Sequence, residues 1–223
     1  MKIKSTPKKA VKAAKPTKLS KTTLEKMLEA TYEKGFNGEV NGYAMDKKLS
    51  SGRVRVFHDD KTKHTVVAHR GSQNTRDWFE NGLYALNLEV GKGWNRSKTA
   101  QKNAEKKYGT GNLTTIGHSK GALHAEKFGK KGGETITLNK PVNLPHALFN
   151  PVADNQTDYT GEGDVVSILR PLQRGNKQVV LKKKKSLYSR AKGLLKKGVV
   201  GYILDEHSTK TLNRLPSEDE ELM

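Results

Sequence analysis

The stretch LTTIGHSKGALHAEKFG, residues 113–129, decides the fold of this chain. Its first letters, LTTI, are apolar or β-branched, which is typical of a buried strand. The letters after Ser119 have the spacing of a helix, and GHSKG lies between the two patterns. The stretch therefore predicts a strand that turns sharply into a helix, with Ser119 at the corner between two glycines.

Strand-like and helix-like segments alternate along the rest of the chain. Residues 53–69 predict a hairpin whose second strand is the more buried, and residues 98–108 have the alanine spacing of a helix. The β-branched runs ETITLN and DVVSIL, at residues 134–139 and 164–169, are typical of two further strands. Strands separated by helices favour an α/β fold with a central, mostly parallel sheet flanked by helices, and argue against a sandwich.

The charge of the chain is unevenly placed. Residues 1–21 contain eight lysines and no acid, and they predict a disordered basic arm because they can bury very little. Thr22 and Glu25 have the spacing of a capping box, so order is expected to begin there with a helix. We expect one domain over residues 22–215 and an acidic tail over residues 216–223.

The composition excludes several kinds of protein. The chain contains no cysteine, so it has no disulfide scaffold, thiol nucleophile or thiolate metal site. No apolar run approaches the roughly 18 residues of a membrane span, and the basic N-terminus lacks the apolar core of a secretory signal. We therefore expect an intracellular protein, with peripheral contact to a membrane surface as one option. The net charge of +19 favours polyanionic partners, either anionic lipid or nucleic acid.

A basic amphipathic helix is predicted over residues 182–204. Its apolar arc is formed by Leu187, Tyr188, Ala191, Leu194, Leu195, Val199 and Tyr202. The basic residues that precede it or fill its opposite arc are Lys182–Lys185, Arg190, Lys192, Lys196 and Lys197. The apolar arc either packs on the sheet or contacts an anionic membrane, where each lysine contributes about 1 kcal/mol. Nucleic acid is the less favoured partner, because no aromatic residues interleave with the lysines of the basic arm.

Ser119 stands in the Gly-x-Ser-x-Gly pattern of a nucleophile elbow, which exposes a serine hydroxyl at a strand-to-helix turn. The same short pattern also occurs in ordinary turns, so it does not decide between the two by itself. In an elbow, the Lys120 N–H at the helix N-terminus can stabilise a developing oxyanion. A serine hydroxyl also needs a histidine to take its proton and a carboxylate to orient that histidine.

In α/β hydrolases the acid and then the histidine follow the serine along the chain, and this order selects the partners. His124 lies on the same predicted helix as Ser119, and His146 precedes most of the acids, which leaves His207 in the loop-like LDEHSTKTL. The aspartates available downstream are Asp154, Asp158, Asp164 and Asp205. We prefer Asp164 because GEGDVVSIL places it at a glycine-flanked strand edge. Taken alone, Asp164 could cap a turn and His207 could be a surface histidine.

Several segments, in the same order along the chain, resemble the class 3 lipase family, the fungal-type triacylglycerol lipases, over roughly residues 53–207. HTVVAHRGSQNTRDW resembles the family's strand that ends in Phe-Arg-Gly-Thr and is followed by Asp-Trp. KKYGTGNLTTIGHSKGAL resembles its helix, strand and Gly-His-Ser-Leu-Gly elbow. TITLNKPVN stands where the family has a strand ending in Gly-Ser-Pro, GDVVSILRP resembles its Asp-x-Val-Pro segment, and a histidine follows near the end. The ordered set is more specific than the elbow alone.

The resemblance implies an α/β-hydrolase fold and a serine esterase that cleaves lipid esters through an acyl-enzyme, without a cofactor or a metal. It makes Ser119 the nucleophile, Asp164 the orienting acid and His207 the base. Ser72, after Arg-Gly, occupies the family's oxyanion-hole position, where its backbone N–H would act together with that of Lys120. The resemblance also places a mobile lid at residues 78–90.

One departure from the family pattern concerns the substrate. Lys120 replaces the usual leucine of the elbow, which puts a cation near the nucleophile and favours an ester with an anionic head group. Two other functions stay open. A non-catalytic basic binding or packaging protein could keep the hydrolase fold and hold nucleic acid or an anionic membrane through its lysines. A peptidase could use the same three residues, because the elbow does not specify the acyl group.

Overall fold

The computed structural model describes residues 17–72, 92–131, 133–175, 177–182 and 205–215. The strands are β1 (Glu39–Val40), β2 (Tyr43–Met45), β3 (Val54–Asp59), β4 (His64–His69), β5 (Leu113–His118), β6 (Glu134–Leu138), β7 (Gln156–Gly161) and β8 (Gln178–Leu181). The α-helices are α1 (Lys21–Tyr32), α3 (Lys92–Tyr108), α4 (Lys120–Phe128) and α5 (Leu144–Phe149). Short 3-10 helices are η2 (Gly129–Lys131), η3 (Val165–Ser167), η4 (Arg170–Leu172) and η5 (Thr209–Arg214).

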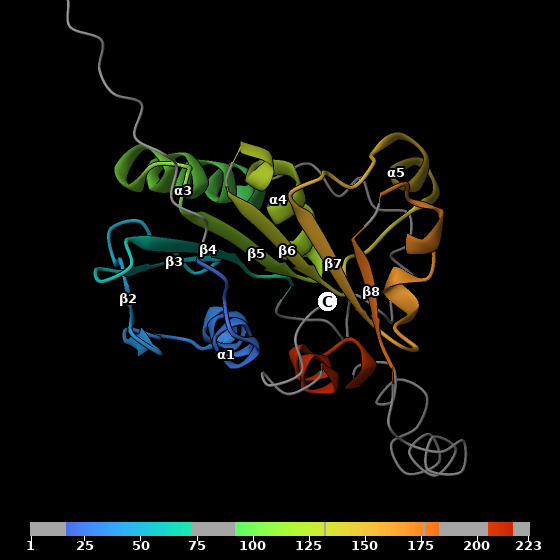
Figure 1. Cartoon of the computed structure of the whole chain (residues 1–223), viewed down its shortest axis with the longest axis horizontal. Coiled ribbons are helices and arrows are strands. Elements are labelled where there is room, and N and C mark those ends of the chain that lie inside the picture. Colours follow the sequence, from blue (N-terminus) through green and yellow to red (C-terminus); the bar gives the residue numbers. More distant parts are fainter. Residues whose placement is uncertain (1–16, 73–91, 132, 176, 183–204, 216–223) are drawn as a thin grey trace, which may run out of the picture.

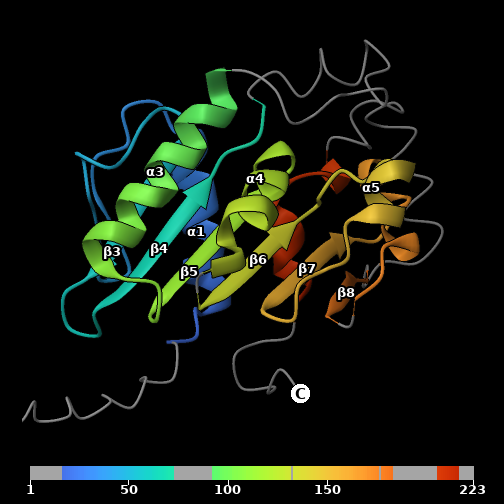
Figure 2. The same cartoon turned by 90° about the horizontal axis from the view of Figure 1, so that it is seen from above.

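The described strands form one sheet in which each strand pairs with the next along the chain. The pairings from β1 to β4 are antiparallel, and those from β4 to β8 are parallel. Right-handed connections between consecutive parallel strands keep their helices on one face of a sheet. Figure 1 shows α3, α4 and α5 on one face, with α1 and η5 on the other, and Figure 2 shows the same layers from above. The predicted α/β fold, with its mostly parallel sheet flanked by helices, is confirmed.

Two apolar layers fix the helices to the sheet. On the α1 face, the buried side chains include Leu24, Met27, Leu28, Phe57, Val66 and Ile116. On the α3 face, they include Val54, Val56, Val67, Ala100, Ala104 and Leu113. Neighbouring residues such as Val66 and Val67 point to opposite faces, as the alternation of a strand requires. Both faces of β4 and β5 are therefore covered, and all residues of these two strands are buried.

The strand predicted from DVVSIL, residues 164–169, is wrong. Residues Val165–Ser167 form η3, and the strand in this part of the chain is β7, over residues for which the sequence analysis predicted no strand. β7 escapes the apolar pattern because it buries polar side chains. Gln156 and Asp158 are buried there and hydrogen-bonded to each other and to neighbouring polar groups.

The predicted capping box is also wrong. The N-cap is Ser20, two residues before Thr22, and helix α1 begins at Lys21. The Ser20 hydroxyl oxygen accepts a hydrogen bond from the Thr23 N–H at 3.2 Å, which satisfies one of the free donors at the helix start. Thr22 lies inside the first turn and does not cap it.

Several predicted features lie outside the described residues. They are most of the basic arm, the acidic tail, the lid at residues 78–90 and the basic helix beyond Lys182. The division into arm, domain and tail therefore stays a prediction. Lys182 itself is exposed. None of the helices in the described ranges combines the length and the apolar character needed to cross a membrane.

Candidate active site

Ser119 occupies a strained corner between two regular elements. It follows the last residue of β5 and precedes the first residue of α4, with φ 56° and ψ −132°. A residue with a side chain rarely adopts a positive φ, and such strain costs about 1–3 kcal/mol. The same backbone is expected of a nucleophile elbow, because the sharp turn lifts the serine hydroxyl out of the sheet.

The two glycines of GHSKG are required by close backbone contacts. A Cβ on Gly117 would collide with the carbonyl oxygen of Gly121, and a Cβ on Gly121 would collide with that of His69. Gly71 is equally confined, since its Cβ would lie 2.8 Å from the Cβ of Ser119. These contacts bring the ends of β4 and β5 against the start of α4. The glycines are therefore required by the close packing around Ser119, beyond what an ordinary turn needs.

Ser119, Asp164 and His207 come together although they lie on separate parts of the chain. The Ser119 Oγ is 2.7 Å from the Nε2 of His207, and the Nδ1 of His207 is 2.9 Å from the Oδ1 of Asp164. All three residues are at most 5% exposed. With neutral His207 protonated at Nδ1, the serine hydroxyl donates to Nε2 and Nδ1–H donates to the carboxylate, which is the arrangement that general-base activation of a serine requires.

The carboxylate of Asp164 is fixed by its own neighbours. Its Oδ1 also accepts from the Val166 N–H at 3.3 Å, and its Oδ2 lies 2.6 Å from the Ser167 hydroxyl. The Ser167 hydroxyl is also 2.8 Å from the Lys140 carbonyl oxygen, so its single proton serves one acceptor at a time. The sequence interpretation missed Ser167, because its role depends on the turn of η3 and not on a strand.

The other candidate acids and histidines are committed elsewhere. Asp158 pairs with the fully buried Lys140, whose Nζ is 2.6 Å from the Asp158 Oδ2 and 3.0 Å from the Glu126 Oε1. His146 bonds to Glu126 at 2.7 Å. Burial alone would raise the pKa of Glu126, but the hydrogen bond from His146 and the charge of Lys140 lower it to about 2.

The remaining alternatives differ from Asp164 and His207 in burial or in their hydrogen-bond partner. Asp154 and Asp205 are exposed, and the Nδ1 of His124 is 2.8 Å from the Ser97 hydroxyl. Within the part of the chain that the structure describes, no group of three or more His, Asp or Glu side chains is arranged to hold a metal ion.

Both predicted oxyanion donors border Ser119. Lys120 is the first residue of α4, and the first N–H groups of a helix have no partner within the helix. Ser72 directly follows Gly71, whose backbone lies against the Cβ of Ser119. The ends of β4, β5 and β7 that supply Ser72, Ser119 and Asp164 are all carboxyl ends of parallel strands, the edge at which ligands bind in open α/β sheets.

Comparison with known proteins identifies the architecture. Neither a family model nor a curated protein matches the sequence. Among solved structures, the Lip2 lipase from Yarrowia lipolytica is similar with a TM-score of 0.51, at 16% identity, covering 72% of this chain and 77% of that one. The chain has the fold of the fungal lipases.

Two further fungal-lipase structures are similar to this chain. A triacylglycerol lipase from Penicillium expansum gives a TM-score of 0.46 at 15% identity, covering 71% of this chain and 77% of that one. A Rhizomucor miehei lipase in complex with its propeptide gives 0.46 at 15% identity, covering 64% and 56%. At these identities the similarity concerns the fold alone. The roles of individual residues therefore depend on the geometry of the site.

Proposed function

We propose that this chain is a serine esterase that hydrolyses lipid esters through an acyl-enzyme on Ser119. The observation that supports it most is the 2.7 Å contact between the Ser119 Oγ and the His207 Nε2, with Asp164 on the opposite nitrogen of the ring. A buried serine, histidine and carboxylate joined in this order form a general-base pathway, and a purely structural role does not require that order.

The proposed reaction proceeds in two halves. The Ser119 Oγ attacks the ester carbonyl carbon while His207 takes the hydroxyl proton at Nε2, and Asp164 stabilises the resulting imidazolium. The N–H groups of Ser72 and Lys120 donate to the oxyanion. When the tetrahedral intermediate collapses, the carbon–oxygen bond to the leaving alkoxide breaks and His207 returns the proton to that oxygen. Water then attacks the acyl-enzyme in the same way and releases the acid and free Ser119.

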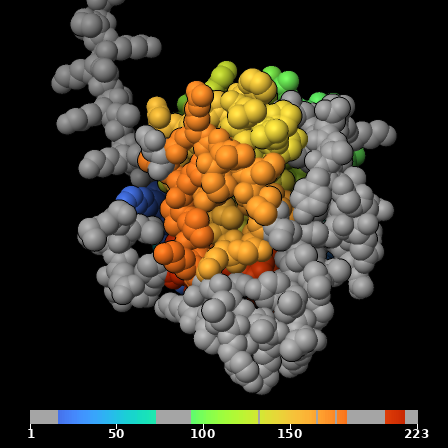
Figure 3. All heavy atoms as spheres, turned by 90° about the vertical axis from the view of Figure 1, so that its right-hand side faces the viewer, coloured from blue at the N-terminus to red at the C-terminus, as the bar shows by residue number. Residues whose placement is uncertain are grey.

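An apolar face supports a lipid substrate. In the described part of the chain, the exposed large hydrophobic side chains are Leu144, Leu148, Phe149, Ile168, Leu172 and Val180. They belong to α5, the η3–η4 segment and β8, which lie together on the face shown in yellow and orange in Figure 3. Exposed apolar side chains gathered on one face mark contact sites for lipid or protein. Two of them, Ile168 and Leu172, lie on the segment that directly follows Asp164.

Three cationic residues near Ser119, namely Arg53, Arg70 and Lys120, support an ester with an anionic group as the substrate. The Arg70 N–H donates to the Arg53 carbonyl at 2.9 Å, and the Arg70 backbone packs against the glycine after Lys120. Burial, and then the charge of Arg53, lower the pKa of both Arg70 and Lys120. None of the three forms an ion pair with a carboxylate in the described ranges. An anionic head group would relieve their mutual repulsion.

Replacing Lys120 with leucine should lower the preference for anionic esters about tenfold, the effect of losing one partly solvated charge pair. The measurement is the ratio of kcat/KM for a short-chain anionic phospholipid to that for a short-chain neutral diacylglycerol, both as monomers. The control is Lys102→Leu, at an exposed position of α3, which should leave the ratio unchanged. An unchanged ratio in Lys120→Leu would remove the cations from substrate choice.

A fluorophosphonate probe tests the proposed function directly. It should attach covalently to Ser119, and peptide mass spectrometry should locate the adduct on the GHSKG segment. If the chain is instead a non-catalytic basic binding protein, we expect no labelling, together with salt-dependent binding to DNA or to anionic vesicles. Labelling combined with cleavage of a peptide amide in preference to an ester would instead favour the peptidase.

A further inference from the structure

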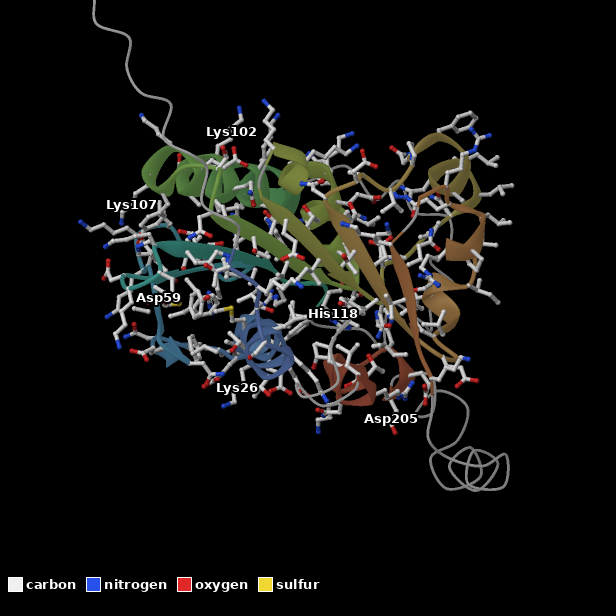
Figure 4. The ribbon with its side chains drawn as sticks, viewed as in Figure 1. Lys26, Asp59, Lys102, Lys107, His118 and Asp205 are labelled. Atoms are coloured by element: carbon white, nitrogen blue, oxygen red, sulfur yellow. The ribbon has the colours of Figure 1, made fainter. Side chains whose placement is uncertain are left out.

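We propose that Tyr32 and His118 form a bridge that positions the oxyanion loop and the catalytic histidine relative to Ser119. The inference rests on the proposed esterase function, and it assigns both residues a positioning role. Tyr32 is the last residue of α1, whereas His118 is the last residue of β5, directly before Ser119. Figure 4 shows the labelled His118 on the α1 side of the sheet.

Three hydrogen bonds define the bridge. The Tyr32 Oη is 3.1 Å from the Gly71 N and 2.7 Å from the His118 Nδ1. The His118 Nε2 is 2.6 Å from the backbone carbonyl oxygen of His207. The bridge therefore starts at Gly71, the residue before Ser72. It passes through Tyr32 and His118 and ends at the backbone of His207.

With a neutral His118 ring, only one arrangement of protons satisfies all three bonds. A backbone N–H can only donate and a carbonyl oxygen can only accept, so the Tyr32 hydroxyl accepts from Gly71 and donates to the His118 Nδ1. The His118 Nε2–H then donates to the His207 carbonyl. Burial raises the pKa of Tyr32 to about 12, while burial and the charge of His207 lower that of His118 to about 3. Both side chains are thus neutral near pH 7, and the bridge holds its groups without transferring a proton.

The bridge acts where small displacements matter most for catalysis. The Ser72 N–H and the His207 ring must both stay aligned with the Ser119 hydroxyl, and a misplacement of about 1 Å can cost on the order of 100-fold in rate. Helix α1 supplies a fixed anchor, because Leu24, Met27 and Leu28 are buried in the core beneath it. Tyr32 transmits that fixed position to two loops that have no strand pairing of their own.

A second pair in the same chain has the same chemistry away from the site. The Tyr43 Oη is 2.8 Å from the His64 Nδ1, and the Nε2 of His64 is also bonded, at 2.9 Å, to the Thr114 hydroxyl. The ring centroids are 5.6 Å apart in both pairs, with interplanar angles of 70° for Tyr32–His118 and 78° for Tyr43–His64. His64 and Thr114 stand at the starts of β4 and β5, the opposite edge of the sheet from Ser119. Loss of the Tyr43 hydroxyl therefore reports the structural cost alone.

The test compares Tyr32→Phe with Tyr43→Phe in the full-length chain. We expect similar losses in the midpoint of thermal unfolding for the two variants. In Tyr32→Phe, kcat for a short-chain nitrophenyl ester should fall about 30- to 100-fold with KM within about twofold, and the midpoints of the pH profile should not move. Tyr43→Phe should keep kcat within about twofold. His118→Asn removes the donor to the His207 carbonyl and should lose kcat by a factor similar to that of Tyr32→Phe.

The outcomes that overturn the bridge are distinct from those that overturn the esterase. An active wild type with kcat within twofold in both Tyr32→Phe and His118→Asn removes the positioning role and leaves the esterase in place. Equal kcat losses in Tyr32→Phe and Tyr43→Phe assign the effect to general destabilisation and also remove it. A wild type that neither hydrolyses esters nor takes up a fluorophosphonate overturns the esterase, and the bridge with it.

Discussion

Replacing Ser119 with alanine should reduce kcat for a short-chain nitrophenyl ester by about five to six orders of magnitude, to the residual rate that substrate binding and the oxyanion donors supply. The reason is that the attacking oxygen is lost, and with it the hydroxyl that is bonded to the Nε2 of His207. The fold should persist, because the change deletes one side-chain oxygen at the end of β5. Steady-state hydrolysis and thermal unfolding of the same preparation measure both effects.

Ser97→Ala is the matched control for this experiment. Ser97 is buried and its Oγ is 2.8 Å from the Nδ1 of His124, so it repeats the serine–histidine contact on the α3 face, without a carboxylate on the other ring nitrogen. Its removal should leave kcat within about threefold. Activity in Ser119→Ala that equals the wild type, or an equal loss in both variants, would contradict the assignment of Ser119 as nucleophile.

Asp164→Asn should lower kcat about 10⁴-fold while leaving the three-dimensional arrangement intact. An amide cannot stabilise the imidazolium as a carboxylate does, and its NH₂ group beside Nδ1 favours the tautomer with the proton on Nε2. The nitrogen that must accept the Ser119 proton is then blocked. The Ser167 hydroxyl can still donate to the amide oxygen, which keeps the side chain in place. Measuring kcat together with the rate of fluorophosphonate labelling tests the effect on serine activation.

Asp205→Asn provides the comparison, because this exposed residue lies two positions before His207 and was the nearest rival acid in the sequence. It should keep kcat within about twofold. A larger loss in Asp205→Asn than in Asp164→Asn would reverse the assignment of the acid.

Prediction from sequence succeeded where local pattern and packing agree. Strands β3, β4, β5 and β6 and helix α4 were predicted because their apolar or β-branched runs are buried as the pattern suggests. β7 could not be predicted in this way, because most of its buried side chains are polar. Asp158 is tolerated there only because Lys140, Thr137 and Gln156 surround it in three dimensions.

The candidate site also contains residues that could be predicted from the sequence and residues that could not. The order of serine, acid and histidine along the chain was sufficient to select Ser119, Asp164 and His207, which the structure brings together. Tyr32 gave no signal, because it lies 86 positions from His118 and nothing near it in the sequence distinguishes it from an ordinary helix tyrosine. His118 stood inside the quoted motif, but a place in a motif does not reveal which residues the side chain bonds to.

The order of the strands has a consequence for how the chain matures. Because every described strand pairs with the one before it along the chain, this part of the sheet can grow strand by strand as the chain leaves the ribosome. The proposed catalytic base, His207, however, comes after β8 along the chain. Under the proposed function, a nascent chain in which the elbow has folded but residue 207 has not yet emerged would remain inert.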